Sequence, residues 1–310
     1  DIATKGYGFH MPIPGYKTDL YKEVVGSTEY INTKLAPPGK KVKVLLWTGD
    51  AIPGEKALKL TVDNGLFNVN GGDTKVLKSS NSLTNVWPIG RAVNNHHQIY
   101  APVMNENVYT NLWNGPYYGF SKVIETFELL EEPIRLKPIS IYYHFYSGSK
   151  VAGLKALDDV YQWAISQPTT SMYLSDYAKR ALAFYKAGLT QTDALTWQIN
   201  HPIDLKTLRL PASLGTPNIA ESDNIIGYKR VKDNYYVHLS PETDATLKLF
   251  KPSSNGQQSS TAQKTPYLYD SNSIIHQWNA QPQFPLTAWS SAWLRAGCGT
   301  SDQWHWSVDW

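Results

Sequence analysis

The sequence predicts an α/β fold, a parallel sheet or barrel with helices outside, followed by a β-sandwich-like module. Up to about residue 190, short apolar runs typical of buried strands alternate with stretches that have helical periodicity. Beyond that point, short strand-like runs follow one another with turn residues and without helices between them. We therefore expect two domains, residues 1–190 and residues 191–310.

The first expected domain opens with a β-α-β rhythm. Asp19 is suited to cap a helix, and Pro37-Pro38-Gly39 ends that helix. The next expected elements are a strand at 41–47, a helix from Pro53 to near Gly65, and a strand at 66–69. Residues 75–120 are less regular and are expected to form long, ordered loops.

The stretch from Lys137 to Lys150 has the clearest strand pattern in the chain. Its middle is aromatic and β-branched, and its side chains alternate, so that Tyr142, His144 and Tyr146 share one face. A helix with Leu154, Leu157, Tyr161 and Ile165 turned inward is expected to follow. Catalytic groups of a βα barrel collect at the C-terminal ends of its strands. His144 is therefore either a catalytic residue or a hydrogen-bonded core histidine.

The second expected domain is built from short strands with turn residues between them. The strand-like runs are 194–198, 205–210, 225–229, 235–239, 246–250, 267–269, 274–278 and 288–294.

Composition excludes several classes of function. The 310 residues are 42% hydrophobic and 18% charged, and the net charge of +3 is too small to indicate nucleic acid or an anionic membrane. No run approaches the roughly 18–20 apolar residues of a transmembrane helix. The single cysteine, Cys298, excludes an internal disulfide framework. The 11 Trp and 20 Tyr, against 8 Phe, suit sugar rings as well as ordinary protein cores, because both side chains combine a flat apolar face with a polar edge.

Three segments of the chain carry a resemblance to a known family: VLLWTGDAIPGEKALKLTVDNGLFNVNGGDT at Val44–Thr74, APVMNENVYTNLWNGPYYGF at Ala101–Phe120, and RLKPISIYYHFYSGSK at Arg135–Lys150. They resemble the deacetylase domain of PelA-type exopolysaccharide (biofilm) proteins, which are relatives of the NodB-like polysaccharide deacetylases. The resemblance covers roughly residues 5–240. It implies an irregular (β/α) barrel of the polysaccharide deacetylase type, here in part, that removes N-acetyl groups from an amino-sugar polymer.

The same resemblance implies a zinc cofactor, but the metal ligands of the family are not present in this chain. In the wider superfamily, an early Asp and a His-x-x-x-His pair hold the metal, and a second early Asp is the general base. This sequence contains no such motifs, and it opens Asp-Ile-Ala-Thr, without a Met or a signal peptide. The chain is therefore interpreted as the later half of the barrel, with the metal and base motifs upstream of it.

Three residues are candidate catalytic groups. His144 matches the histidine that protonates the leaving amine in the family, since it precedes a helix and a short strand–helix in the same order. That role needs an acid that titrates near neutral pH. Asp50 could orient the acid or base or bind a sugar hydroxyl, and it could equally be a turn residue. Asp73 could tune a catalytic histidine, although Asn/Gly turns such as the one before it are common.

Polar and aromatic residues near the predicted strand ends are candidate substrate ligands. The adjacent His96 and His97 are poor metal co-ligands without a third group, because neighbouring side chains diverge. The candidate substrate-binding residues are Trp47, Asn70, Asn105, Glu106, Tyr109, Trp113 and Tyr146.

Three functions remain open from the sequence. The first is metal-dependent N-deacetylation of an N-acetylhexosamine exopolysaccharide, in the periplasm or outside the cell, with export machinery as a possible partner. The second is a carbohydrate-binding or scaffold protein without catalysis. The third is a glycoside hydrolase, because Asp50, Asp73 and Glu106 could supply the two facing carboxylates that such enzymes use.

Overall fold

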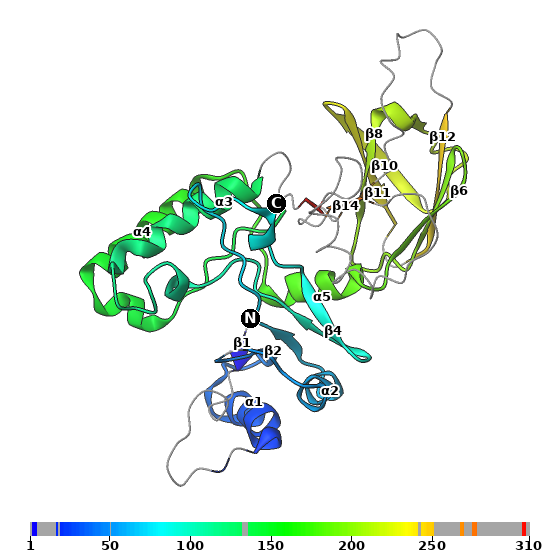
Figure 1. Ribbon diagram of the computed structural model, residues 1–310. Helices are drawn as coiled ribbons and strands as arrows, with labels where there is room; N and C mark the ends of the chain where they lie inside the picture. The colour runs from blue at the N-terminus through cyan, green and yellow to red at the C-terminus, as the bar shows by residue number, and fades with distance from the viewer. Residues whose placement is uncertain are drawn as a thin grey trace. The chain divides into compact units, whose positions relative to one another are not determined.

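The computed structural model describes most of the chain as two compact units (Figure 1). Unit 1 comprises Asp1–Thr126 and Ile139–Leu182, and unit 2 comprises Phe127–Pro138 and Ala183–Trp310. The described residues are 2–4, 17, 19–49, 51–131, 136–240, 243–250, 267–269, 275–277 and 306–307. Within them, no helix has both the length and the apolar character needed to cross a membrane.

Unit 1 contains a mixed sheet with the strand order β1-β2-β3-β5-β4. Its first four strands in that order are parallel, and β4 pairs with β5 antiparallel. The strands are β1 (Ile2–Thr4), β2 (Val42–Leu46), β3 (Phe67–Val69), β4 (Gly90–Val93) and β5 (His96–Ile99). The α/β class is therefore confirmed. Because β1 and β4 are the two edges of this sheet, the described strands do not close into a barrel.

The helices of the predicted β-α-β region are present. Asp19 caps the first helix: its Oδ1 accepts hydrogen bonds from the main-chain N–H groups of Tyr21, at 2.9 Å, and Lys22, at 3.2 Å. This helix consists of a π-helical segment Lys22–Gly26, α1 (Ser27–Tyr30) and a second π-helical segment Ile31–Leu35. The helix α2 (Glu55–Asp63) lies between β2 and β3 and buries Ala57, Leu58 and Thr61, whereas Val62, which the sequence pattern groups with them, is 55% exposed.

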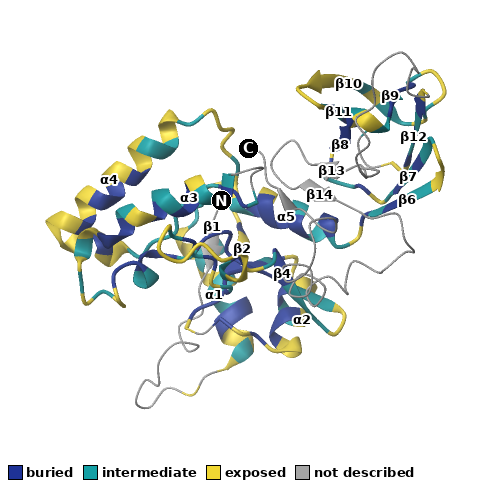
Figure 2. Cartoon of the chain, turned by 45° about the horizontal axis from the view of Figure 1, so that its top comes forward, coloured by how far each residue is buried: buried dark blue, intermediate teal, exposed yellow. Residues whose placement is uncertain are grey.

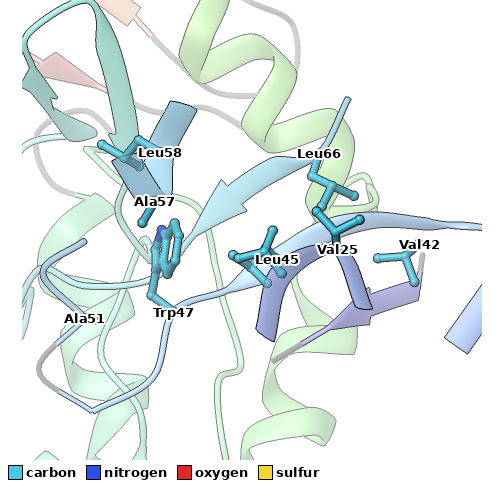
Figure 3. Packing of buried hydrophobic residues seen from close by; sticks show 9 residues of the cluster. Val25, Val42, Leu45, Trp47, Ala51, Ala57, Leu58 and Leu66 are labelled. Carbon is cyan, nitrogen blue, oxygen red and sulfur yellow. The ribbon is translucent and has the colours of Figure 1, made fainter. Parts of the chain in front are cut away.

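One apolar cluster joins the first helix, β2 and α2. Figure 3 shows side chains from all three elements turned toward one another, with Leu45 and Trp47 from the end of β2 among them. Burial of each valine or leucine side chain in it contributes on the order of 1.5–3 kcal/mol. The buried members are Val24, Val25, Val42, Leu45, Trp47, Ala51, Ala57, Leu58 and Leu66. This packing fixes the C-terminal end of β2, where polar residues follow.

The prediction of a strand within Lys137–Lys150 is wrong. Its residues before Phe145 belong to no strand of the structure, and Phe145–Ser149 is a 3₁₀ helix in which the Phe145 side chain is 95% exposed. The main-chain N–H of His144 donates to a glutamate side chain, at 3.1 Å, where a strand would require a ladder partner. At this position a side chain, and not a neighbouring strand, therefore provides the hydrogen-bond acceptor.

The remaining helices of unit 1 differ from expectation in their faces and ends. Residues 75–120, which were expected to form long loops, contain the strands β4 and β5 and three 3₁₀ helices, at Leu83–Asn85, Glu106–Val108 and Tyr117–Lys122. The helix α3 (Val123–Glu131) was not predicted. The helix α4 (Val151–Ser166) is present, but of its four expected inward residues only Leu157 is buried. Figure 2 shows exposed segments along α4. The helix α5 (Leu174–Phe184) corresponds to the helix that the sequence predicts from Ser175 through Phe184, whereas the short strand expected just before it, at 171–174, is absent from these described residues.

Unit 2 contains two antiparallel sheets, with the orders β10-β11-β8-β13-β14-β15 and β6-β7-β12-β9. Burial alternates along β7, β11 and β12, as expected for sheets with one buried face. The strands are β6 (Gly188–Asp193), β7 (Thr196–Asn200), β8 (Thr207–Pro211), β9 (Thr216–Pro217), β10 (Ile225–Val231), β11 (Asn234–Leu239), β12 (Ala245–Phe250), β13 (Tyr267–Tyr269), β14 (Ile275–Gln277) and β15 (Trp306–Ser307). The strand expected at 288–294 lies outside the described residues.

Candidate functional site

The ends of β2 and β3 are joined by asparagine side chains. The Trp47 indole N–H donates to Asn68 Oδ1 at 3.0 Å, and Asn70 Nδ2 donates to the Trp47 carbonyl at 2.6 Å. Asn70 has a φ of 110°, a conformation that non-glycine residues rarely adopt. Strained residues of this kind are concentrated at functional sites.

Asn70 also connects β3 to the segment that contains His144. Its Nδ2 donates to the Tyr142 hydroxyl at 2.8 Å. Burial raises the pKa of Tyr142, while its hydrogen bonds with Asn105 and Asn70 act in the opposite direction. The Tyr142 and His144 rings lie 5.9 Å apart. Asn70 thereby links the end of β3 to Tyr142, whose ring is a neighbour of the candidate acid His144.

The central pair of the site is Glu106 and His144. The carboxylate oxygen Glu106 Oε1 lies 2.8 Å from His144 Nδ1 and also accepts the His144 main-chain N–H. The Glu106 side chain is fully buried, whereas the His144 side chain is 26% exposed. Glu106 opens the 3₁₀ helix Glu106–Val108, which Asn105 caps by accepting the Asn107 N–H at 3.0 Å. The carboxylate therefore holds the ring, and the other ring nitrogen, Nε2, has no hydrogen-bond partner among the described residues.

A column of aromatic rings supports His144 on its other side. The Tyr146 ring stacks on the imidazole with a centroid distance of 5.0 Å and an interplanar angle of 5°. Trp113 lies 5.1 Å from Tyr146 and also 5.1 Å from Tyr117, and Lys150 Nζ lies 5.4 Å from the centre of the Tyr117 ring. The imidazole is thus confined between a carboxylate and a stacked ring.

Trp113 reaches this column from a left-handed turn. Asn111, Leu112 and Trp113 have φ values of 48°, 53° and 64°, each of which costs about 1–2 kcal/mol for a non-glycine residue. The turn is held by hydrogen bonds from the Leu112 N–H to the Asn107 carbonyl, at 2.9 Å, and from the Trp113 N–H to Thr110 Oγ1, at 3.2 Å. The fold therefore retains a costly conformation at the point where Trp113 supports Tyr146.

The structure brings together most of the candidate residues but not all of them. Trp47 belongs to the site through its carbonyl oxygen, which accepts a hydrogen bond from Asn70, while its ring is buried in the core. Tyr109 is also buried, and its hydroxyl lies 2.9 Å from Thr126 Oγ1. Asp73 is exposed and has no hydrogen bond to another described residue, and Asp50 lies outside the described residues. The residues that the structure assembles around His144 are Asn70, Asn105, Glu106, Trp113 and Tyr146.

Two further residues of the site were not among the candidates. Asn107 Oδ1 accepts the Tyr146 hydroxyl at 2.6 Å, and Tyr142 bonds Asn70. Tyr142 shares the alternating face with His144, and Asn107 belongs to the polar run Asn105-Glu106-Asn107. The sequence therefore contained a pattern that could have identified each of these two residues. The pairing of Asn107 with Tyr146 joins positions far apart in the chain, and no local pattern marks it.

The described residues do not supply a zinc site. Among them, no three or more His, Cys, Asp or Glu side chains are grouped closely enough to hold a metal ion. At the site itself the donors are one carboxylate and one imidazole, which already bond each other. A structural or catalytic zinc ion takes at least three protein ligands.

Comparison of the chain with protein-family models, with curated proteins and with solved structures found no match. The geometry of the site therefore carries the functional argument.

Proposed function

We propose that this chain is part of a carbohydrate N-deacetylase in which His144 donates the proton to the leaving amine. The observation that carries the proposal is the His144–Glu106 pair. A fully buried carboxylate holds Nδ1 at 2.8 Å, and Nε2 belongs to a partly exposed ring beside Tyr146 and Trp113. The resemblance of three segments to PelA-type deacetylase domains supports the same role for His144.

Hydrolysis of an N-acetyl group consumes one water. The water oxygen adds to the acetyl carbonyl carbon, and the tetrahedral intermediate then breaks its C–N bond, which yields acetate and an amine. The departing nitrogen needs a proton. His144 can provide it from Nε2, because Glu106 stabilises the imidazolium and holds the ring in place. A positioned acid of this kind contributes roughly 10²–10⁴-fold to the rate.

Zinc enters the proposal only through the resemblance. Because the described residues do not form a three-ligand site, we assign no step of the reaction to a metal. The open sheet of unit 1 is compatible with one part of an irregular deacetylase barrel. A hexosamine polymer as substrate, a periplasmic or extracellular location and contact with export machinery belong to the same proposal.

A carbohydrate-binding protein without catalysis is the second candidate. The exposed part of Tyr146 and the half-buried Trp113 and Tyr117 provide aromatic surface for a sugar ring, and binding requires no metal. A glycoside hydrolase has less support. Glu106 is fully buried and already bonds His144, while Asp73 is exposed, so these two carboxylates do not act as a facing pair.

Acetate release from N-acetylhexosamine oligomers tests the proposal. The assay compares the natural full-length protein with its His144→Ala and His201→Ala variants, with and without added Zn²⁺. His201 is a matched control, since it also lies near a carboxylate, at 3.7 Å from Asp244, but is 73% exposed and belongs to unit 2. We expect His144→Ala to lower turnover about 100-fold or more and His201→Ala to leave it within about twofold.

Three outcomes would contradict the deacetylase. Full activity of His144→Ala would remove the proposed acid. Oligomer binding without acetate release under any metal condition would indicate the binding protein. Shortening of the oligomer without acetate release would indicate the glycoside hydrolase.

A further inference from the structure

The oxygen of the Tyr142 hydroxyl receives two amide hydrogens. Asn70 Nδ2 donates to it at 2.8 Å, and the same nitrogen donates to the Trp47 carbonyl at 2.6 Å. A carbonyl oxygen only accepts, so the Asn70 atom that faces Tyr142 is the amide nitrogen. Asn105 forms the second hydrogen bond to Tyr142. Because Asn105 Oδ1 accepts the main-chain N–H of Asn107, at 3.0 Å, its Nδ2 is left for the phenol.

The pKa of Tyr142 agrees with this direction of the two hydrogen bonds. Burial raises the pKa above its usual value of 10.0, while the hydrogen bonds with Asn105 and Asn70 lower it. A group that donates to the phenol oxygen stabilises the phenolate and lowers the pKa, whereas a group that accepts the phenol proton raises it. Both asparagines therefore act as donors. Because burial dominates, the phenol keeps its own proton at neutral pH.

That proton has no acceptor among the described residues. The charged neighbour of the phenol is Glu106, but its Oε2 has no hydrogen-bond partner in the described part of the chain. Its Oε1 accepts the ring and main-chain N–H groups of His144. With two N–H groups on its oxygen, the Tyr142 hydroxyl directs its proton away from both asparagines. The site therefore contains an O–H donor that is held in place and is not used by the fold.

This donor lies next to the proposed acid. The centre of the Tyr142 ring is 5.9 Å from that of His144, and the two ring planes are inclined at 38°. In an acetamido group the carbonyl oxygen and the nitrogen are bonded to the same carbon atom. A donor to the oxygen and an acid for the nitrogen therefore have to be neighbours in the protein. Tyr142 and His144 meet this requirement.

We propose that the Tyr142 hydroxyl binds the carbonyl oxygen of the substrate's N-acetyl group and stabilises the negative charge that this oxygen acquires during hydrolysis. The charge develops when water adds to the carbonyl carbon, and it is lost when the C–N bond breaks. Tyr142 thus donates a hydrogen bond and transfers no proton. The two amide hydrogens on its oxygen polarise the O–H and make it a stronger donor. This inference rests on the proposed function, because it names the group that the same site recognises.

Calorimetric binding tests the recognition without turnover. The natural full-length protein with His144→Ala is compared with the same protein carrying Tyr142→Phe as well, so that the acetyl groups stay in place. The ligands are an N-acetylhexosamine oligomer and the same oligomer without its acetyl groups. We expect Tyr142→Phe to weaken binding of the acetylated oligomer about fivefold and to change binding of the other less than about twofold. Tyr143→Phe is the matched control, because its hydroxyl bonds Tyr161 instead, and it should change neither.

Turnover provides the second readout, in the protein that retains His144. Loss of one hydrogen-bond donor to a developing oxyanion lowers kcat roughly 100–1,000-fold. We expect Tyr142→Phe to lower kcat about 100-fold or more, with KM changed far less.

Fluorotyrosine at position 142 separates the donor from a structural role. It keeps the ring, the hydroxyl and the hydrogen bonds from both asparagines, but the phenol is a stronger acid. Because only the protonated phenol donates, kcat should fall at a lower pH than in the wild type as the pH is raised. The charge of Glu106, which also raises the pKa of Tyr142, is the same in both proteins.

The two proposals fail in different ways. Unchanged binding of the acetylated oligomer in Tyr142→Phe would overturn the role of Tyr142 even if His144→Ala abolished acetate release. Selective loss of that binding in a protein that releases no acetate would retain the hydrogen bond to the acetyl group and remove the deacetylase. If Tyr142→Phe does not fold, the fluorotyrosine protein decides: a pH dependence of kcat, or of oligomer binding, that matches the wild type would contradict the donor.

Discussion

The Glu106 carboxylate has both a structural and a chemical role. Its Oε1 satisfies the main-chain N–H of His144 and also holds Nδ1 of the ring. A charge of this kind is costly to bury without partners, so its hydrogen bonds to His144 are needed for stability as well as for orientation. The two tasks can be separated because glutamine retains an acceptor oxygen and alanine does not.

We expect Glu106→Ala to lower the free energy of unfolding by about 1–3 kcal/mol, because it leaves the His144 N–H without its acceptor. Glu106→Gln should cost less stability but still lower turnover roughly 10–100-fold, since a neutral amide stabilises an imidazolium poorly. Urea unfolding and acetate release measure the two effects. Full turnover in Glu106→Gln would show that the charge is not needed.

At the scale of elements, the start of α4 is packed against the aromatic column. A Cβ added at Gly153 would lie 2.6 Å from the Ser147 carbonyl oxygen and 2.9 Å from Cη2 of Trp113. The buried face of α4 is accordingly made of small residues together with Leu157 and Val160. Glycine at this position allows the helix to approach Trp113, which in turn contacts Tyr146.

Gly153→Ala should therefore destabilise the protein by about 1–3 kcal/mol, although alanine in a helix normally gains up to about 1 kcal/mol over glycine. The expected shift of the Trp113 indole N–H resonance would show that the column has moved. Gly148→Ala is the matched control, because a Cβ there meets nothing within 4 Å. Equal unfolding free energies for the two variants would contradict the close packing of α4.

At the scale of the whole molecule, the buried Lys137 makes stability depend on pH. Burial lowers the pKa of this lysine from 10.5 to about 7 in the folded protein. Between these values the unfolded chain binds more protons than the folded one, so the free energy of unfolding rises with pH in that window. Below about pH 7 this lysine is protonated in both the folded and the unfolded state, so its contribution to the pH dependence levels off.

Lys137→Met removes this dependence while keeping an unbranched apolar side chain. We expect the free energy of unfolding of the variant to exceed that of the wild type by the largest amount at about pH 6. Above pH 7 this difference should shrink by at most about 1.4 kcal/mol per pH unit. Urea unfolding at several pH values measures this difference. Lys186→Met, at an exposed position, is the control and should show no such trend. A constant advantage across the window would contradict the lowered pKa.

Much of the fold follows from local pattern. The Asp19 cap, the strands β2 and β3, the helix α2 and most strands of unit 2 were predicted, because hydrophobic period and capping chemistry act over a few residues. The strand within 137–150 and the inward face of α4 were wrong for a shared reason. Tertiary partners, the Glu106 side chain and Trp113, replaced the ladder and the large apolar contacts that the local pattern favours.

The sequence by itself therefore determined the α/β class, the strands β2 and β3, most strands of unit 2 and the position of His144 among polar and aromatic residues. Only the tertiary structure decided that Glu106 is the partner of His144 and that Asn107 holds Tyr146, at separations of 38 and 39 positions along the chain. The physical reason is that a hydrogen bond depends on distance and direction in space, and those depend on how loops pack. Periodicity determines which face a residue occupies, but not which distant side chain meets it there.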